Sequence, residues 1–226
     1  MPVIPAMPLW AILAISAVAD YFLGCFNGAV IVSKYILRDD VRTHGSGNAG
    51  LTNFYRTFGG PLTAVVILTD VLKAVAAVLV TQWLVFQGHA IYLSAAGAVA
   101  FYDALAKYWA GVFCLLGHMF PVMFRFKGGK GILSGGTIAW MIDWRVALVV
   151  WGGFLILSVV TKYVSLGSCW AGVSFPFVSW FVFQNYVILI LSIICGGLIL
   201  YQHRGNIKRL LNGTESKFHF HHKKTE

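Results

Sequence analysis

Charged residues are scarce in this chain, and acidic residues are the scarcest. Of its 226 residues, 11% are charged, with 8 acidic against 17 basic, while 58% are hydrophobic. A mean hydropathy of +0.76 with so little charge excludes an ordinary soluble domain and indicates an integral membrane protein. The formal net charge of +9 could suggest a nucleic-acid partner. We expect no such partner, because no basic face with interleaved aromatic residues lies outside the apolar segments.

The chain also lacks the short motifs of metal sites, disulfide-bonded domains and common acyl-transfer enzymes. Its four cysteines lie singly within apolar stretches and never reach CxxC spacing, so we predict neither a metal site nor a disulfide framework. No GxSxG sequence is present, and no histidine is followed five positions later by aspartate. These absences exclude a serine nucleophile of the hydrolase type and the HxxxxD acyltransferase mechanism.

Seven apolar runs take up most of the sequence. A span needs roughly 20 apolar residues, so the runs predict an all-α, polytopic integral membrane protein with about seven transmembrane helices in one domain, 1–226. The predicted spans are 8–34, 62–86, 95–117, 131–143, 146–161, 168–183 and 186–202. The fourth would rise only ~20 Å as a helix, short of the ~30 Å hydrocarbon core. It must therefore be tilted, shielded by neighbours or fused to flanking residues.

Basic residues collect on one side of this helix arrangement. The loops 35–61, 118–130 and 162–167 and the tail from 203 carry nearly all of the loop lysines and arginines, whereas Arg145 is the clear exception on the other side. Lysine and arginine are enriched in the cytoplasmic loops of membrane proteins. The sequence therefore predicts an N-terminus outside and a C-terminus in the cytoplasm.

The most polar interruption of the apolar pattern is the stretch 45–53, GSGNAGLTN. Glycines let consecutive backbone N–H groups point into one concavity, and small polar side chains add further donors. This composition suits a phosphate-binding loop, and the alternative is a simple turn between helices. The GxGxxG spacing also matches a dinucleotide fingerprint, but a Rossmann motif needs a preceding buried strand and a βαβ unit, whereas this loop lies between long apolar runs.

A second glycine-rich loop follows the third span and reads FKGGKG over 126–131. Lys127 and Lys130 bracket Gly128 and Gly129, and the helix expected to begin there presents the positive end of its dipole. Together these features indicate an anion site, although the Walker A spacing is absent. The alternative is a positive-inside membrane anchor, which accounts for the lysines but not for the glycines.

Several isolated polar residues complete the pattern. His203 and Asn206 lie three positions apart in the tail, so they share one helical face and could both reach a site at the membrane boundary. The alternative for this stretch is a basic amphipathic helix on the membrane surface. For His118 two roles stay open: it is either an orienting group or general base, or a structural histidine. Asp70 and Lys73, inside the second span, are costly in hydrocarbon and are expected to pair with each other.

In combination, these blocks resemble the bacterial membrane acyl-phosphate:glycerol-3-phosphate acyltransferase family over nearly the whole chain. The blocks that carry the resemblance are GSGNAGLTN at 45–53, GHMFP at 117–121, FKGGKG at 126–131, KYVSLGS at 162–168 and HRGNIKRLLNGTE at 203–215. One departure is Gly205, where the family usually has glutamate.

The resemblance implies an enzyme that transfers a fatty acyl group from acyl phosphate to the 1-hydroxyl of glycerol 3-phosphate. The products would be 1-acyl-sn-glycerol 3-phosphate and phosphate, in phospholipid synthesis. It implies a multi-pass protein of the bacterial inner (plasma) membrane whose active site faces the cytoplasm, with membrane lipids as partners and no cofactor. A small anion transporter is the competing class, but it would place its polar residues near the midplane and show a repeat.

The glycine-rich loops and the resemblance together predict roles for particular residues. The catalytic residues would be Ser46, Arg56, Lys130, His203 and Asn206. The residues that bind substrate phosphate would be Gly45, Gly47, Asn48, Thr52, Asn53, Lys127, Gly128, Gly129 and Ser165. His118 is a possible further member, and no metal ligand is expected.

Overall fold

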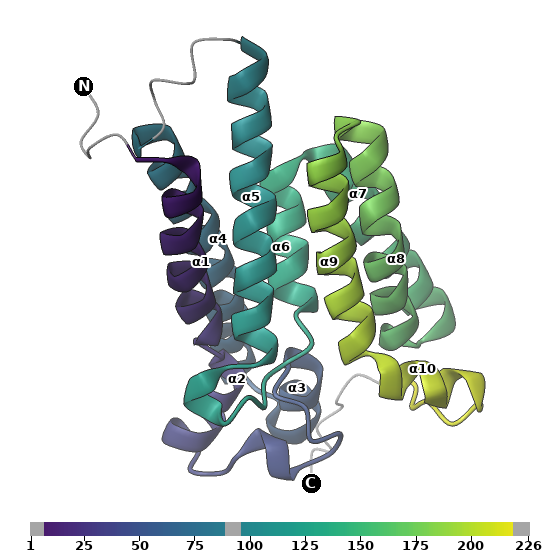
Figure 1. The fold of residues 1–226 in the computed structure, drawn as a ribbon. Coiled ribbons are helices and arrows are strands. Elements are labelled where there is room, and N and C mark those ends of the chain that lie inside the picture. Colours follow the sequence, from purple (N-terminus) through teal and green to yellow (C-terminus); the bar gives the residue numbers. More distant parts are fainter. Residues whose placement is uncertain (1–6, 89–95, 219–226) are drawn as a thin grey trace, which may run out of the picture.

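Helices make up the regular structure of the computed structural model, which describes residues 7–88 and 96–218. The seven apolar helices (Figure 1) are α1 (Leu9–Cys25), α4 (Leu62–Gly88), α5 (Ala96–Met119), α6 (Ile132–Ile142), α7 (Trp144–Thr161), α8 (Val164–Phe183) and α9 (Tyr186–Gln202). No strand occurs within the described residues, and the predicted all-α class is confirmed.

The seven helices form two groups that α6 joins. On one side α1, α4 and α5 pack against one another, and on the other side α8 packs between α7 and α9. α6 packs against α4, α5 and α7, while α5 also contacts α9 (Figure 1). The short α6 is thus shielded by its neighbours, which is one of the three arrangements that its length left open.

The number of membrane spans depends on how the bent and short helices are counted. By length and composition, α4, α7, α8 and the stretch Gly97–Phe124 are each long enough to cross a membrane. Two bent pairs can each form a further span, α1 with Gly28–Ile36 and α9 with α10 (Arg204–Leu211). This makes up to six spans in the described residues. A seventh crossing would rest on α6, which has 11 residues, so the count of seven stays a prediction.

The first predicted span, 8–34, is not one continuous helix. α1 ends at Cys25, and the chain bends by 40° before α2 (Gly28–Ile31) and a π-helical segment (Val32–Ile36). Asn27 starts the new helix, because its Oδ1 accepts the N–H of Val30 (3.1 Å) as an N-cap. Its Nδ2 donates to the carbonyl oxygen of Ala49 (3.0 Å), which ties the bend to the first glycine-rich loop.

Two helices begin earlier than the predicted spans. α8 begins at Val164 rather than at 168, which places Ser165 in its first turn. α7 begins at Trp144 rather than at 146, because the Asp143 carboxylate caps it by accepting the N–H of Arg145 (2.8 Å). The earlier start of α8 places Ser165 beside the first N–H groups of the helix, which lack partners within the helix.

Glycine lets two pairs of helices approach closely. A Cβ at Gly117 of α5 would lie 2.0 Å from the carbonyl oxygen of Tyr21 in α1, and a Cβ at Gly196 of α9 would lie 2.3 Å from the carbonyl oxygen of Gly172 in α8. Lipid tails are as apolar as leucine, so helices in a bilayer associate through close packing and polar contacts rather than through hydrophobic burial. A side chain at either glycine would separate its helix pair.

Two buried aspartates inside the bundle have partners on the same or a neighbouring helix. Thr81 Oγ1 of α4 donates to Asp20 Oδ2 of α1 (2.6 Å). Asp70 Oδ1 lies 2.7 Å from Lys73 Nζ, which confirms the predicted ion pair. These contacts offset part of the cost of placing polar groups away from water.

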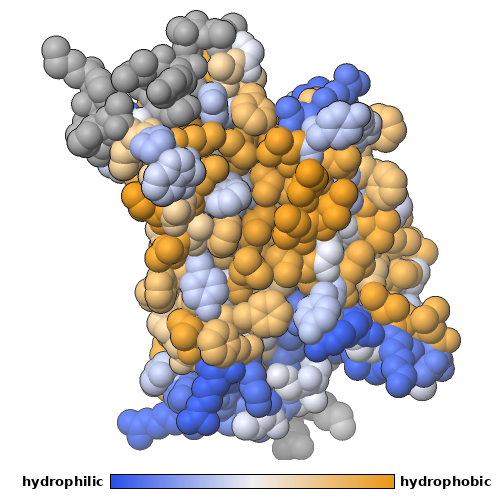
Figure 2. Space-filling model, in the orientation of Figure 1, coloured by the Kyte–Doolittle hydropathy of each residue, from blue (hydrophilic) through white to orange (hydrophobic). Residues whose placement is uncertain are grey.

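The short elements and most loops gather at one end of the bundle. α2, α3 (Leu51–Phe58) and α10 lie there, at the lower end of Figure 1. In the same view, hydrophobic residues cover the middle of the bundle and hydrophilic residues concentrate at this end (Figure 2). The loops predicted to be cytoplasmic meet here, and we call this region the polar end.

This arrangement predicts which positions an impermeant thiol reagent reaches from each side of the membrane. In a variant whose four cysteines are replaced by alanine, Thr43→Cys, Lys127→Cys and Lys208→Cys, all exposed, should react only from the cytoplasm. Arg145→Cys should react only from outside. Labelling of intact cells and of inverted vesicles measures both, and reaction of Arg145→Cys on the same side as Lys208→Cys would contradict the topology.

Candidate active site

A cavity of about 260 Å³ lies at the polar end of the bundle. Three helices begin at its wall: α3 after Gly50, α6 after Gly131 and α8 after Tyr163, and none of these three residues caps its helix with a side chain. A helix N-terminus carries unpartnered N–H groups and roughly +0.5 of an elementary charge. The cavity is therefore suited to anions.

Most of the residues predicted for the site lie around this one cavity, although they are far apart in the sequence. Those that line it are Ser46, Asn48, Thr52, Asn53, Arg56, His118, Lys130, Ser165, His203 and Asn206. The remaining predicted residues, Gly45, Gly47, Lys127, Gly128 and Gly129, do not line it.

Asn53 determines the shape of the first glycine-rich loop. The two N–H groups of its Nδ2 are shared among the carbonyl oxygens of Val41 (3.0 Å), His44 (3.1 Å) and Asn48 (3.0 Å). Its Oδ1 accepts the N–H of Ser46 (3.1 Å). The polar atoms of this side chain are thus engaged within the loop, and Asn53 holds the loop together rather than offering a donor to phosphate as predicted.

Gly45 and Gly47 also serve the turn rather than the cavity. Their φ angles are +53° and +68°, in the left-handed region that favours glycine. The side chains of Ser46, Asn48 and Thr52 lie at the cavity wall. Ser46, Asn48 and Thr52 are therefore placed where they can contact a bound phosphate, as predicted. The two glycines instead allow the turn of the loop.

The second glycine-rich loop packs against the end of α5. The N–H groups of Gly128 and Gly129 donate to the carbonyl oxygens of Met119 (3.2 Å) and His118 (3.1 Å), so they are not free to bind phosphate. A Cβ at Gly128 would lie 2.0 Å from the His118 carbonyl oxygen, so only glycine fits. Lys127 is exposed outside the cavity. These three residues differ from their predicted role, because they form the turn that precedes Lys130.

A chain of hydrogen bonds runs along the cavity wall from Lys130. Its Nζ donates to Asn206 Oδ1 (2.5 Å), and Asn206 Nδ2 donates to Glu215 Oε1 (2.7 Å). Arg209 Nε donates to Glu215 Oε2 (2.7 Å). Burial, assisted by the positive charge of Arg209, lowers the pKa of Lys130 to about 8. Although burial opposes it, hydrogen bonds from Asn206 and Arg209 hold the pKa of Glu215 below its usual value.

His203 lies at the junction of α9 and α10 and is 3% exposed. Its Nδ1 lies 2.8 Å from the carbonyl oxygen of Ile199. Because a carbonyl oxygen only accepts, Nδ1 carries the proton and Nε2 is left as an acceptor. Burial lowers the pKa of His203 to about 4, so the ring is neutral at physiological pH. The cavity thus combines cations with one neutral histidine acceptor.

The segment 214–218 borders the rim of the cavity next to Arg56. Arg56 Nη1 lies 3.5 Å from Ser216 Oγ, and its guanidinium lies 5.8 Å from the centre of the Phe218 ring. The N–H of Phe218 donates to the carbonyl oxygen of Lys162 (2.8 Å), just before α8. The segment therefore connects α3 to the start of α8 at the rim.

The cavity wall also includes residues that were not predicted as site residues, although Asp70 had been predicted to pair with Lys73. Among them are Asp70, Trp151, Phe154, Ser168, Arg209, Glu215 and Ser216. An acidic residue in an otherwise basic tail was one available signal, and it pointed to Glu215. Trp151 and Phe154 lie within an apolar run, where no pattern distinguishes a cavity-facing side from a lipid-facing side.

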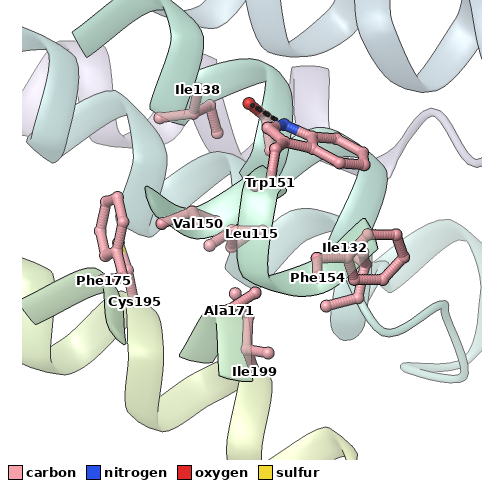
Figure 3. A pocket seen from close by; sticks show the side chains of 12 residues that line it. Leu115, Ile132, Ile138, Val150, Trp151, Phe154, Ala171, Phe175, Cys195 and Ile199 are labelled. Carbon is pink, nitrogen blue, oxygen red and sulfur yellow. Dashed lines mark hydrogen bonds between the residues drawn. The ribbon is translucent and has the colours of Figure 1, made fainter. Parts of the chain in front are cut away.

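A narrow apolar pocket of about 20 Å³ adjoins the polar cavity. Ile132, Trp151 and Phe154 line both spaces, and the pocket continues among α5, α6, α8 and α9 (Figure 3). Trp151 Nε1 donates to the carbonyl oxygen of Gly136 (3.1 Å), which holds the indole at the junction. The polar cavity is therefore bordered on this side by apolar side chains, although the pocket itself has room for little more than a water molecule. Within 7–88 and 96–218, no group of three or more His, Cys, Asp or Glu is placed to hold a metal ion.

Comparison with known proteins gives consistent matches over the length of the chain. Residues 14–213 match the family model described as glycerol-3-phosphate acyltransferase. The glycerol-3-phosphate acyltransferase of Thermoanaerobacter pseudethanolicus is 38% identical over 203 residues, which cover 90% of this chain and 94% of the relative. The Bacillus subtilis protein of the same name is 32% identical over 206 residues, covering 91% and 97%.

Solved structures give the same result. The crystal structure of PlsY, an integral membrane glycerol 3-phosphate acyltransferase, in its glycerol 3-phosphate form matches with a TM-score of 0.75 and 30% identity. The match covers 92% of this chain and 96% of PlsY. The lysophosphatidic acid form of PlsY matches with a TM-score of 0.71.

The positions of the two loop lysines predict unequal effects on anion binding. Lys130→Ala removes a buried charged donor at the cavity and should weaken the binding of inorganic phosphate by roughly 10- to 100-fold, because a hydrogen bond to a charged group contributes about 1.5–3 kcal/mol. Lys127→Ala is the matched control and should leave binding within about threefold, since surface charges contribute little. Titration of the purified proteins by calorimetry measures both. Equal weakening by the two substitutions would contradict the assignment.

Proposed function

Because this chain belongs to the glycerol-3-phosphate acyltransferase family, we propose that its polar cavity transfers a fatty acyl group from acyl phosphate to the 1-hydroxyl of glycerol 3-phosphate. The products are 1-acyl-sn-glycerol 3-phosphate and phosphate, as expected for phospholipid synthesis. The observation that carries the proposal is the convergence of three helix N-termini, Arg56 and Lys130 on a cavity that adjoins an apolar pocket. The cavity suits the phosphates of both substrates, and the apolar side chains at its border suit the start of the acyl chain.

The substrate phosphates would occupy the positive end of each of these helices. α3 and α8 present Thr52 and Ser165 next to their free N–H groups, and Lys130 lies just before α6. Such N-termini are common binding sites for phosphate. Arg56 adds a guanidinium, whose planar donors match phosphate oxygens in pairs. Three helix N-termini, Arg56 and Lys130 together supply more positive charge than a single phosphate needs, which supports the binding of two phosphates.

The acyl chain would extend from the cavity past Ile132, Trp151 and Phe154, and the side chains of the 20 Å³ apolar pocket would have to move apart to admit it. This placement puts the acyl carbonyl carbon at the boundary between the polar and apolar spaces. The attacking hydroxyl and the departing phosphate then both lie on the polar side. Positioning of this kind converts a reaction between two molecules into an effectively unimolecular step.

The reaction needs no covalent enzyme intermediate, because acyl phosphate is a mixed anhydride with a good leaving group. The 1-hydroxyl oxygen attacks the carbonyl carbon, the bond between that carbon and the phosphate oxygen breaks, and phosphate leaves with the electron pair. N–H groups and Lys130 stabilise the negative charge that develops. His203 Nε2 accepts a hydrogen bond from the hydroxyl and orients it. With a pKa near 4, His203 does not retain the proton, which passes to a phosphate oxygen with a pKa of about 6.

We place the cavity on the cytoplasmic face of the bacterial inner membrane, with membrane lipids around the apolar helices. The basic loops at the polar end support this side. The phosphate groups of both substrates would then reach the cavity from the cytoplasmic side. A transporter would instead need its binding groups near the midplane, whereas this cavity lies at one end of the bundle.

The donor provides the most direct test of this function. Purified protein incubated with acyl phosphate and glycerol 3-phosphate should form lysophosphatidate and phosphate, as measured by mass spectrometry and a phosphate assay. Acyl-CoA and acyl carrier protein should give no transfer, because a thioester lacks the anionic oxygens next to its carbonyl. Incubation with acyl phosphate alone should leave no acyl group on the protein. Efficient use of acyl-CoA or a trapped acyl-enzyme would overturn the mechanism.

The lowered pKa of Lys130 predicts a loss of activity in mildly alkaline solution. Its pKa of about 8 means that the amine is charged below pH 8 and neutral above it, so kcat/KM for glycerol 3-phosphate should fall as pH rises from 7 to 9. The substrate phosphate is fully ionised over this range, since its second pKa is about 6. Lys130→Arg keeps its charge at all these pH values, so its profile should lack the fall. If kcat/KM of Lys130→Arg fell in the same way, the fall would come from the titration of another group.

A further inference from the structure

Three ionisable side chains next to the cavity have no role in the mechanism above. Asp70 and Lys73 lie on α4 and His118 lies on α5, and their exposed fractions are 4%, 5% and 2%. Asp70 and His118 line the cavity, whereas Lys73 is not among its lining residues. Buried ionisable residues inside a membrane bundle are costly and usually have a function.

The hydrogen bonds of Lys73 determine where the proton of His118 lies. Lys73 Nζ is 2.7 Å from Asp70 Oδ1, 2.6 Å from His118 Nδ1 and 2.9 Å from the carbonyl oxygen of Phe26. An ammonium group has three N–H donors and no acceptor, so these three partners use all of them. Nδ1 of His118 therefore accepts, and the neutral ring carries its proton on Nε2.

The break between α1 and α2 supplies the third of these partners. Phe26 lies at that break with an extended backbone, so its carbonyl oxygen is outside the regular helix. With Asp70 paired in the same cluster, Lys73 is held from three directions. The ammonium is thus a fixed donor to the imidazole rather than a mobile side chain.

The protonated edge of the His118 ring lies where the two glycine-rich loops meet. A Cβ at Gly129 would lie 2.2 Å from His118 Nε2 and 2.9 Å from the carbonyl oxygen of Ala49. The next residue along the chain is Lys130, whose amine reaches Asn206. The ring therefore lies between the loop that contributes Ser46 and Asn48 and the turn that presents Lys130.

We propose that Lys73 is a positioning residue that holds His118 as a neutral Nε2–H donor toward a substrate phosphate in the cavity. A neutral donor suits this position, because an imidazolium directly beside the Lys73 ammonium would add like-charge repulsion. The proposal rests on the function proposed above, since it identifies a further group that contacts the same substrates. The competing explanation is that the cluster only joins α1, α4 and α5.

The tautomer of His118 can be measured directly. In purified protein labelled with ¹⁵N-histidine at neutral pH, the nitrogen chemical shifts distinguish protonated from unprotonated ring nitrogens, and His118→Asn identifies the resonances of His118. We expect Nε2 to be protonated and Nδ1 to be unprotonated. A protonated Nδ1, or a charged ring, would overturn the proposal.

Kinetics separate a positioning role from a purely structural one. Lys73→Met should lower kcat/KM for glycerol 3-phosphate by roughly 10- to 100-fold, by analogy with residues that orient the histidine ligands of metal sites. Lys107→Met is the matched control, because Lys107 is also a helix lysine paired with an aspartate, Asp103 at 2.7 Å, but lies outside the cavity. It should change kcat/KM by less than about threefold.

The double variant gives the decisive comparison. If Lys73 acts through the imidazole, adding Lys73→Met to His118→Ala should cost little beyond His118→Ala alone, since residues that act as a unit are not additive. Losses that multiply would show that Lys73 acts independently and would overturn the proposal. Absence of transfer by the wild-type protein would instead reject the proposed function, which the tautomer measurement does not depend on.

Discussion

The structure depends on three helix N-termini, those of α3, α6 and α8, that meet at one cavity without side-chain caps. Each end leaves several backbone N–H groups without partners, and such groups cannot be placed in hydrocarbon without a cost of several kcal/mol each. The three helices must therefore begin where water or an anion can satisfy them. This requirement explains why a predominantly apolar chain keeps most of its polar loops at one end. It also explains why α6 can be short, because its start is fixed at the cavity while its neighbours surround it.

The charges around the cavity are close to balanced only when an anion is present. Three helix ends contribute roughly +0.5 each, and Arg56, Lys130 and Arg209 add whole charges. Glu215 offsets part of this, since it accepts from both Asn206 and Arg209. Burial first, and then the positive charge of Arg209, lower the pKa of Lys130. A phosphate group would relieve the remaining excess of positive charge, so binding and protonation of Lys130 are coupled in this glycerol-3-phosphate acyltransferase.

The glycines act in this protein mainly through their lack of a side chain. Gly117 and Gly196 let neighbouring helices touch backbone to backbone, and Gly128 and Gly129 let a loop lie directly on the end of α5. The contacts at Gly117, Gly128 and Gly129 pack α1, α5 and the second loop together next to the cavity. Ser46, Asn48 and Lys130, which line the cavity, are each next to a glycine or one residue from it. Close packing in lipid thus supports the site as well as the bundle.

Hydropathy and charge were sufficient to determine an all-α membrane protein and to locate its apolar helices, whereas the residues predicted for the site came from the glycine-rich loops together with the family resemblance. Those features follow from local composition, because lipid demands long apolar runs and phosphate demands polar, basic breaks between them. The sequence could not show that Asn27 breaks the first helix, that the N–H groups of Gly128 and Gly129 bind the end of α5, or that Trp151 faces the cavity. Each of these depends on a partner far away in the chain. A donor that is free in a local pattern is occupied once a distant carbonyl oxygen packs against it, and only the tertiary structure decides which carbonyl that is.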